Sequence, residues 1–136
     1  MEYLDTAAIL WVHEVNYFSS AHLAGAAEEL SGKACRIEGL KGHFDELRLK
    51  VKKTLSTLNI PHTEKEIIEA VYGAKNAIKH MDSRNDASVD IDAKKEAAGY
   101  IIAAYLNFEN LGLDGELSKS VKEVVEANAI YVEIGA

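Results

Sequence analysis

Apolar residues recur every three or four positions along almost the whole of this chain. One such stripe, near the N-terminus, consists of Leu4, Ala8, Trp11, Val15, Phe18 and His22. This period places side chains on one face of an α-helix, whereas a half-buried strand would alternate at every second residue. The chain has a single proline, so long helices can run without interruption. We therefore expect an all-α protein: an antiparallel helical bundle of about five helices in which residues 1–136 form a single domain.

Capping residues, glycines and the proline predict where these helices begin and end. The first expected helix covers residues 3–31 and stops at Ser31-Gly32, and a break near Ser19-Ser20 would divide it into two. The second covers residues 34–58, and the third begins at the capping box Thr63-Glu64-Lys65-Glu66. The fourth extends from Asp92 to Gly112, and the last begins after Asp114-Gly115. Residues 81–91 are expected to form a polar loop that carries Asp82, Asp86 and Asp90. The tail at 129–136 fits either an extended segment or a frayed helix.

The apolar stripes also predict which residues are buried. The helix at 3–31 is apolar on nearly every side, which predicts a central position or a subunit interface. In the helix at 34–58, the lysine-rich stretch from Arg48 to Lys53 should face water, and the buried stripe is expected to be Ile37, Leu40, Phe44, Leu47, Val51, Leu55 and Leu58. For the later helices the expected stripes are Ile67, Val71, Ala74 and Ile78; Ala97, Ile101, Ala104, Phe108 and Leu111; and Leu117, Val121, Val124 and Val125.

Charge and cysteine content restrict the classes of partner and compartment. The formal net charge of −7 argues against a constitutive nucleic-acid binder, although it leaves room for a local basic site. The lone Cys35 excludes an intramolecular disulfide and a thiolate-rich metal site, and it fits a reducing compartment. The longest apolar run, residues 100–106, is far shorter than the ~20 residues that span a bilayer. We expect a cytoplasmic protein with no membrane segment and no cofactor.

Lys75, Asn76 and His80 form the most chemically distinctive segment of the chain. They gather at the end of the third predicted helix, immediately before the aspartate-containing loop. Asn76 and His80 are four residues apart and therefore share a helix face. Basic residues in the last turns also complement the negative end of the helix dipole, so a purely structural role explains them as well.

The spacing Lys75-Asn76-x-x-x-His80 resembles the signature of the HEPN superfamily of helical domains, in which an arginine precedes a histidine by four to six positions. The alanine-rich stretch from Ala21 to Leu30, which contains Glu28-Glu29, is similar to a helix of several HEPN groups, including abortive-infection proteins. The resemblance implies a homodimer, and active members of the family are metal-independent ribonucleases. It implies that His80 is the general acid/base, that Lys75 stabilises charge on the phosphate, and that Asn76 positions one of them.

One position departs from that signature. Lys75 stands where the family has arginine, and its ammonium lacks the planar fork that holds a phosphate through two hydrogen bonds. The resemblance therefore predicts a catalytically weak or inactive RNA- or nucleotide-binding or defence-associated module. The alternatives are a protein-interaction module without chemistry, such as a partner of a toxin–antitoxin-type protein, and a bundle that binds a small apolar ligand.

Four polar residues of the first predicted helix have other interpretations. His13 and Glu14 lie inside the apolar run at 9–18, which predicts a buried, hydrogen-bonded pair or a ligand pocket lined by Trp11, Tyr17 and Tyr105.

His22 and Glu29, two turns apart, offer two metal ligands, but the chain contains no Glu-x-x-His pair to complete such a site. No metal site is therefore expected.

If the segment at 75–80 is the remnant of an RNA-cleaving site, Lys75→Arg should restore more cleavage than any other single change. The guanidinium donates two parallel hydrogen bonds to a phosphate. Adding His80→Ala should then abolish the activity, because a general acid/base contributes about 10²- to 10⁴-fold. The measurement is cleavage of a labelled RNA by the wild type and both variants without added metal. Equal inactivity of all three would reduce the motif to the basic end of a helix.

Overall fold

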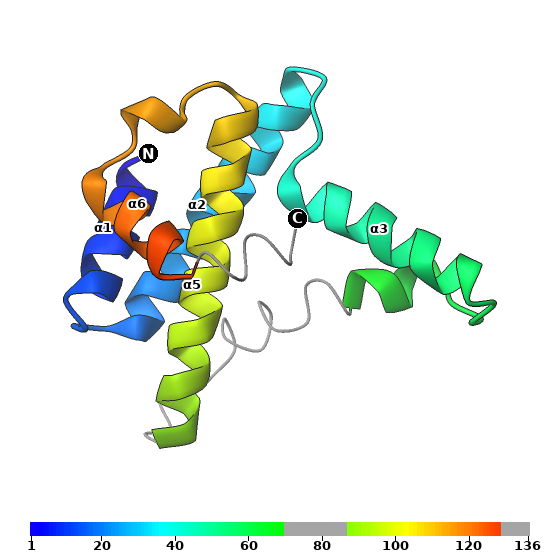
Figure 1. Ribbon diagram of the computed structural model, residues 1–136, viewed down its shortest axis with the longest axis horizontal. Coiled ribbons are helices and arrows are strands. Elements are labelled where there is room, and N and C mark those ends of the chain that lie inside the picture. The colour runs from blue at the N-terminus through cyan, green and yellow to red at the C-terminus, as the bar shows by residue number, and fades with distance from the viewer. Residues whose placement is uncertain (70–86, 129–136) are drawn as a thin grey trace.

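The regular structure in the described part of the chain is helical, as the period of its apolar residues predicts (Figure 1). The computed structural model describes residues 1–69 and 87–128, and no strand occurs in those two ranges. The helices are α1 (Glu2–Val12), α2 (Tyr17–Ile37), α3 (His43–Thr57), α5 (Ala87–Asn110), the short 3₁₀ helix η1 (Asp114–Glu116) and α6 (Lys119–Ala127). Residues 64–69 are also helical. The all-α prediction is confirmed.

The helix at the centre of the fold is α5, against which α1, α2, α3 and α6 all pack. Residues 100–104 are buried without exception, which covers every side of one helical turn. The predicted stripe is confirmed, since Ala97, Ile101, Ala104 and Phe108 are buried and Leu111 is partly buried. The central position that the sequence suggested for the first helix therefore belongs to α5.

The two longest helices, α2 and α5, pack together and run in the same direction. Near the start of both helices the Lys94 ammonium lies over the Tyr17 ring, 5.7 Å from its centroid. Near their ends the Asn107 amide donates to the Ser31 hydroxyl at 3.0 Å. The prediction of an antiparallel bundle is thus corrected for this central pair. Because parallel neighbours cannot be joined by a tight turn, α2 and α5 are not consecutive, and α3 lies between them in the chain.

The first predicted helix is two helices, and they separate at residues 13–16 rather than at Ser19-Ser20. Glu14 adopts a left-handed backbone conformation (φ 54°) just beyond the end of α1. The Asn16 side chain then accepts the Ser19 N–H at 3.0 Å and starts α2. The Ser20 hydroxyl lies inside α2 and donates to the Ala7 carbonyl of α1 at 2.8 Å. Ser20 therefore joins the two helices instead of separating them.

The next boundary also lies later than predicted. α2 continues through Ser31-Gly32 and ends at Ile37, after which Gly39 takes the left-handed conformation (φ 76°) that often terminates a helix. The glycine that close packing requires is Gly42, because a Cβ there would lie only 3.3 Å from the Gly32 Cα, whereas a Cβ on Gly32 would meet its nearest neighbours at an ordinary 3.7 Å. The chain between α2 and α3 thus folds back against α2, and α3 starts at His43.

α3 projects from the bundle as an arm (Figure 1), so most of its apolar stripe is not buried. No residue of α3 is fully buried. Ile37 and Leu58, which were predicted to be buried, are 82% and 62% exposed. Phe44 is the main contact with the bundle, since its ring meets Tyr100 of α5 edge-on with centroids 6.1 Å apart. Lys50, Lys52 and Lys53 are exposed, as predicted for the lysine-rich stretch.

A helix begins at residue 64, as the capping box predicts. The Thr63 hydroxyl accepts the Glu66 N–H at 3.2 Å and lies at the same distance from the Glu66 carboxylate. Ile67 is buried, and a salt bridge between Lys52 and Glu64 places this segment beside α3. The other residues predicted for this stripe, Val71, Ala74 and Ile78, lie outside the described residues.

The C-terminal helices follow their predictions with one correction. α5 begins at Ala87, so residues 87–91 are helical and do not belong to a loop, whereas Asp82 and Asp86 lie outside the described residues. α5 ends at Asn110, just before Gly112, and the Ser118 side chain caps α6. The stripe of α6 is confirmed for Leu117, Val121 and Val124, which are buried, and Val125 is partly buried.

The tail at 129–136 lies outside the described residues. In the ranges 1–69 and 87–128, no helix has the length and apolar character that crossing a bilayer requires.

A single buried amide determines where α3 leaves the bundle. The Asn107 side chain of α5 is fully buried, and its Nδ2 donates to Ser31 Oγ at 3.0 Å and to the Glu28 carbonyl of α2 at 3.4 Å. Its Oδ1 accepts the backbone N–H of His43, the first residue of α3, at 2.6 Å. Asn107 therefore connects α5 to both α2 and α3.

Asn107→Ala is expected to lower the free energy of unfolding by about 1–3 kcal/mol, because polar groups at its buried site lose their partner. Asn110→Ala is the matched control: this exposed amide lies one turn later and hydrogen-bonds only the Lys41 carbonyl, at 3.3 Å, among the described residues. Its substitution should cost about 0.5 kcal/mol or less. Urea denaturation of both variants is the measurement. Equal losses would contradict the connecting role of Asn107.

Candidate functional site

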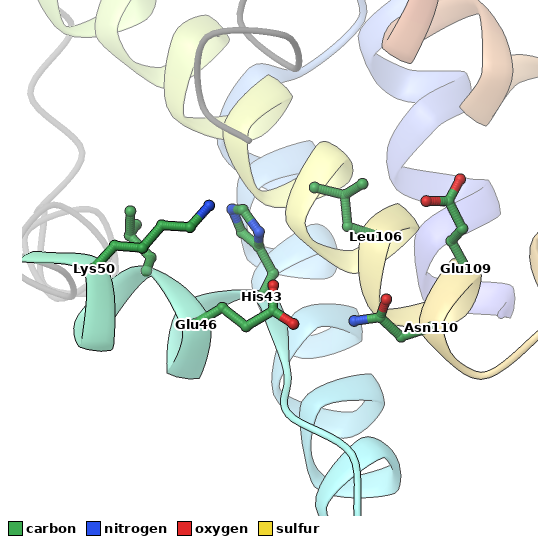
Figure 2. Close-up of a pocket in the computed structure, with 7 residues that line it drawn as sticks. His43, Glu46, Lys50, Leu106, Glu109 and Asn110 are labelled. Carbon is green, nitrogen blue, oxygen red and sulfur yellow. The ribbon is translucent and has the colours of Figure 1, made fainter.

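A cleft of about 200 Å³ opens at the junction of α3 and α5 (Figure 2). Its lining residues are His43, Glu46, Leu47 and Lys50 from α3, and Leu106, Glu109 and Asn110 from α5. The cleft thus gathers an imidazole, an ammonium group, an amide and two carboxylates around two leucines. A concave surface with a few convergent polar groups is the usual form of a small-molecule site. We call it the α3–α5 cleft.

Helical spacing brings the α3 residues of the cleft together. His43, Glu46 and Lys50 follow one another at intervals of three and four, which places them on one face of α3. In Figure 2 the Lys50 ammonium points toward the His43 ring, and the Glu46 carboxylate lies beside the ring on the side of Asn110. The Glu109 carboxylate points away from these four groups. The polar centre of the cleft therefore consists of His43, Glu46, Lys50 and Asn110.

The environment of His43 keeps its imidazole neutral at pH 7. Burial lowers the pKa of this side chain below its ordinary value of 6.5. The negative charge of Glu46 raises that pKa and the positive charge of Lys50 lowers it, and both effects are smaller than that of burial. A neutral imidazole has one N–H donor and one acceptor nitrogen, so His43 offers the cleft both kinds of hydrogen bond.

Hydrogen bonds around the first turn of α3 hold the cleft in place. The Asp45 carboxylate accepts the Gly42 N–H at 3.2 Å and pairs with Arg36 of α2 at 3.0 Å. Asn110 Nδ2 donates to the Lys41 carbonyl at 3.3 Å, which joins α5 to the segment before α3. These contacts act together with Asn107 to set the position of α3 relative to α5. The cleft is therefore built on rigid elements at its base.

The site predicted from the sequence lies elsewhere in the chain. Lys75, Asn76 and His80 fall in the segment 70–86, outside the described residues. Their assignment as a phosphate-binding and acid/base group therefore stays a prediction. The residues of the α3–α5 cleft were not singled out from the sequence.

The prediction of a buried, hydrogen-bonded pair of His13 and Glu14 is wrong, because both residues are exposed. Both residues lie in the turn between α1 and α2, where the predicted apolar stripe no longer packs in the core. The pocket predicted beside Trp11, Tyr17 and Tyr105 stays a prediction; the Lys94 ammonium lies over two of these rings, 5.4 Å from the Trp11 centroid and 5.7 Å from the Tyr17 centroid. The Trp11 indole N–H also donates to the Lys94 carbonyl at 3.0 Å.

The two metal-ligand candidates of the first helix do not converge on a site. His22 and Glu29 are both exposed on α2. Among the described residues, no group of three or more His, Cys, Asp or Glu side chains is arranged to hold a metal ion. The single thiol does not change this result, because Cys35 is buried and its Sγ contacts the Asn107 carbonyl at 3.4 Å.

One sequence signal could have pointed to the cleft. The series His43, Glu46 and Lys50 places three different functional groups on one helical face, at the start of a helix rich in cations. The same residues also fit an ordinary solvated helix face, so the signal is weak. Glu109 and Asn110 carry no local signal at all, because only the packing of α3 against α5 brings them to the cleft.

Comparison with protein-family models, with curated proteins and with solved structures gave no match to this chain.

NMR titration is expected to give a midpoint below 6.5 for His43, because burial opposes its protonation. Lys50→Gln should raise that midpoint and Glu46→Gln should lower it further, since each removes one of the two opposing charges. The imidazole of His43 binds a proton more readily in the unfolded chain than in the folded one, so protonation favours unfolding. The contribution of neutral His43 to the free energy of unfolding is therefore complete above about pH 6.5 and is lost as the pH falls through the folded-state pKa. A midpoint at or above 6.5, or variants that shift it in the opposite directions, would contradict this environment.

Proposed function

We propose that this chain is a HEPN-like, homodimeric and cytoplasmic module that is catalytically weak or inactive and is either RNA- or nucleotide-binding or defence-associated, and of these we favour binding of RNA or nucleotides. The observation that carries the binding proposal is the charge of residues 41–53, which we call the basic segment. It contains five cations, Lys41, Arg48, Lys50, Lys52 and Lys53, against two acidic residues, in a chain whose formal net charge is −7. Binding through phosphates depends on such a local cluster of cations.

The arrangement of the basic segment supports this proposal in two ways. The projecting position of α3 leaves its lysines exposed, so an extended strand could lie along it (Figure 1). One of the two acidic residues, Asp45, is already engaged by Arg36 and the Gly42 N–H. The nearby Glu64 carboxylate is likewise paired with Lys52. The negative charges beside α3 are thus partly neutralised within the protein.

Exposed apolar side chains on the first two helices support the homodimer. Tyr3, Ile9 and Leu30 are 50%, 45% and 56% exposed, although they belong to the strongly apolar stretch at 3–31. An apolar helix surface that the fold itself does not cover is a common element of a two-fold interface.

A second candidate function is a protein-interaction module without chemistry, as for a toxin–antitoxin-type partner. It is favoured by the apolar residues toward the far end of the arm, where Leu58 and Ile60 are 62% and 46% exposed. A protein partner would bind this region through apolar contacts, whereas RNA would bind through the cations. The two candidates therefore predict different responses to salt.

We expect a labelled single-stranded RNA to bind with an affinity that falls as salt rises, and the fall should depend on the basic segment. A variant with Lys41→Gln, Arg48→Gln and Lys53→Gln should reduce the slope of log K against log[salt] by about 2, since each phosphate contact contributes about 0.7 for a single strand. Lys50 and Lys52 are left unchanged, because one lines the cleft and the other pairs with Glu64. Fluorescence anisotropy over a series of salt concentrations is the measurement.

The matched control carries Lys33→Gln, Lys119→Gln and Lys122→Gln, which remove the same number of charges from exposed lysines of α2 and α6. Its slope should stay at the wild-type value. Identical slopes for the two triple variants would show that binding does not use α3, and an absence of RNA binding would favour the protein-interaction module. Light scattering of the same samples should give about twice the chain mass of 14.9 kDa if the protein is a homodimer.

A further inference from the structure

The size and walls of the α3–α5 cleft suit one flat ring system. Its volume of about 200 Å³ lies below the roughly 300–1,000 Å³ of pockets for drug-sized ligands, so its occupant is a small molecule or one part of a larger one. Leu47 from α3 and Leu106 from α5 supply apolar surface on the two sides of the cleft. A nucleobase has apolar faces and a polar edge, which matches this combination.

The position of Glu46 selects among the bases. Its carboxylate lies between His43 and Asn110 (Figure 2), and an ionised carboxylate only accepts hydrogen bonds. Guanine presents a ring N–H and an exocyclic amino group side by side, so both can donate to one carboxylate. In adenine and cytosine an acceptor nitrogen stands next to the amino group, and in uracil two carbonyls flank the single N–H. Only guanine offers two adjacent donors.

A donor for the remaining atoms of guanine lies one turn beyond Glu46 on the same face of α3. The Lys50 ammonium carries three N–H donors, so it can serve a ring oxygen or nitrogen in addition to its other contacts. Lysine commonly donates to the O6 and N7 acceptors of guanine. The Glu109 carboxylate, at the α5 side, would repel a phosphate, which places the sugar and phosphate toward the cations of α3.

We infer that the α3–α5 cleft binds the guanine base of a nucleotide or of a single-stranded RNA, with the Glu46 carboxylate accepting both N–H groups of its Watson–Crick edge. This inference rests on the proposed function, because it gives a base preference to a module that otherwise binds through phosphates. It gives a role to Glu46, an acidic residue within the basic segment whose presence phosphate binding does not explain.

The test uses the full chain and three mononucleotides. GMP should bind more tightly than IMP, which lacks the exocyclic amino group, and more tightly than AMP, which presents an acceptor to Glu46. A bidentate contact to a base discriminates by roughly 5- to 150-fold, and that is the expected ratio of the GMP and AMP dissociation constants. Titration calorimetry gives the constants, and NMR shifts of His43 and Asn110 show that the nucleotide enters the cleft.

Glu46→Gln separates recognition by the carboxylate from binding by charge. The amide keeps the size of the side chain but replaces one acceptor oxygen with a donor, so the preference for GMP over AMP should disappear. Glu116→Gln is the matched control, since it removes the same charge from an exposed carboxylate of η1 and should leave the preference intact. Glu46 is exposed, so both variants should keep the thermal unfolding midpoint of the wild type.

Three results would overturn the inference: no binding of GMP, equal binding of GMP and AMP, or a preference for GMP that survives Glu46→Gln. These results are distinct from a failure of the proposed function. RNA binding that depends on the basic segment but shows no preference for guanine would remove the cleft proposal alone. Binding of GMP in the cleft without any binding of RNA would remove the RNA proposal alone.

Discussion

The arrangement of this protein depends on one buried amide, that of Asn107. An asparagine side chain with no access to water is stable only if its donors and acceptor find partners, and here the partners come from two other helices. The Ser31 hydroxyl holds the amide against α2, and the first N–H of α3 holds its oxygen. This contact, together with those of Asp45 and Asn110, fixes where α3 leaves the bundle and so brings its cleft residues to α5. The close approach of Gly32 and Gly42 leaves room for it.

The parallel packing of α2 and α5 explains why the candidate site lies at the edge of the fold. Two parallel helices need a long connection, and that connection contains α3. The core can therefore be completed by α1, α2, α5 and α6, while α3 is free to carry charged and polar residues. The same division separates two kinds of surface, since the basic segment lies on the arm and the acidic residues dominate the rest of the chain. The α3–α5 cleft, in which we propose that a nucleotide binds, lies where the arm meets the rest of the fold.

The sequence predicted the helices well where each signal was local. The stripe of α5, the stripe of α6 and the capping box at Thr63 are all confirmed. The end of α1 was missed because Glu14 occupies the left-handed position, where a glycine or asparagine would have marked the stop. Gly32 was misread as such a stop, because α2 continues through it to Ile37 and the glycine in the left-handed conformation is Gly39. The stripe of α3 and the cleft residues Glu109 and Asn110 could not be predicted, since their burial and proximity depend on how α3 packs against α5.

Trp11 gives this fold an internal optical reporter. It is the only tryptophan of the chain, and its indole is anchored by a hydrogen bond to the Lys94 carbonyl and by the ammonium of the same residue. Its fluorescence therefore reports on the docking of α1 on α5. A change in the arm, whether by ligand or by mutation, would leave that emission unaltered as long as the bundle stays intact. The intensity and wavelength of one fluorophore thus separate unfolding of the core from events at α3.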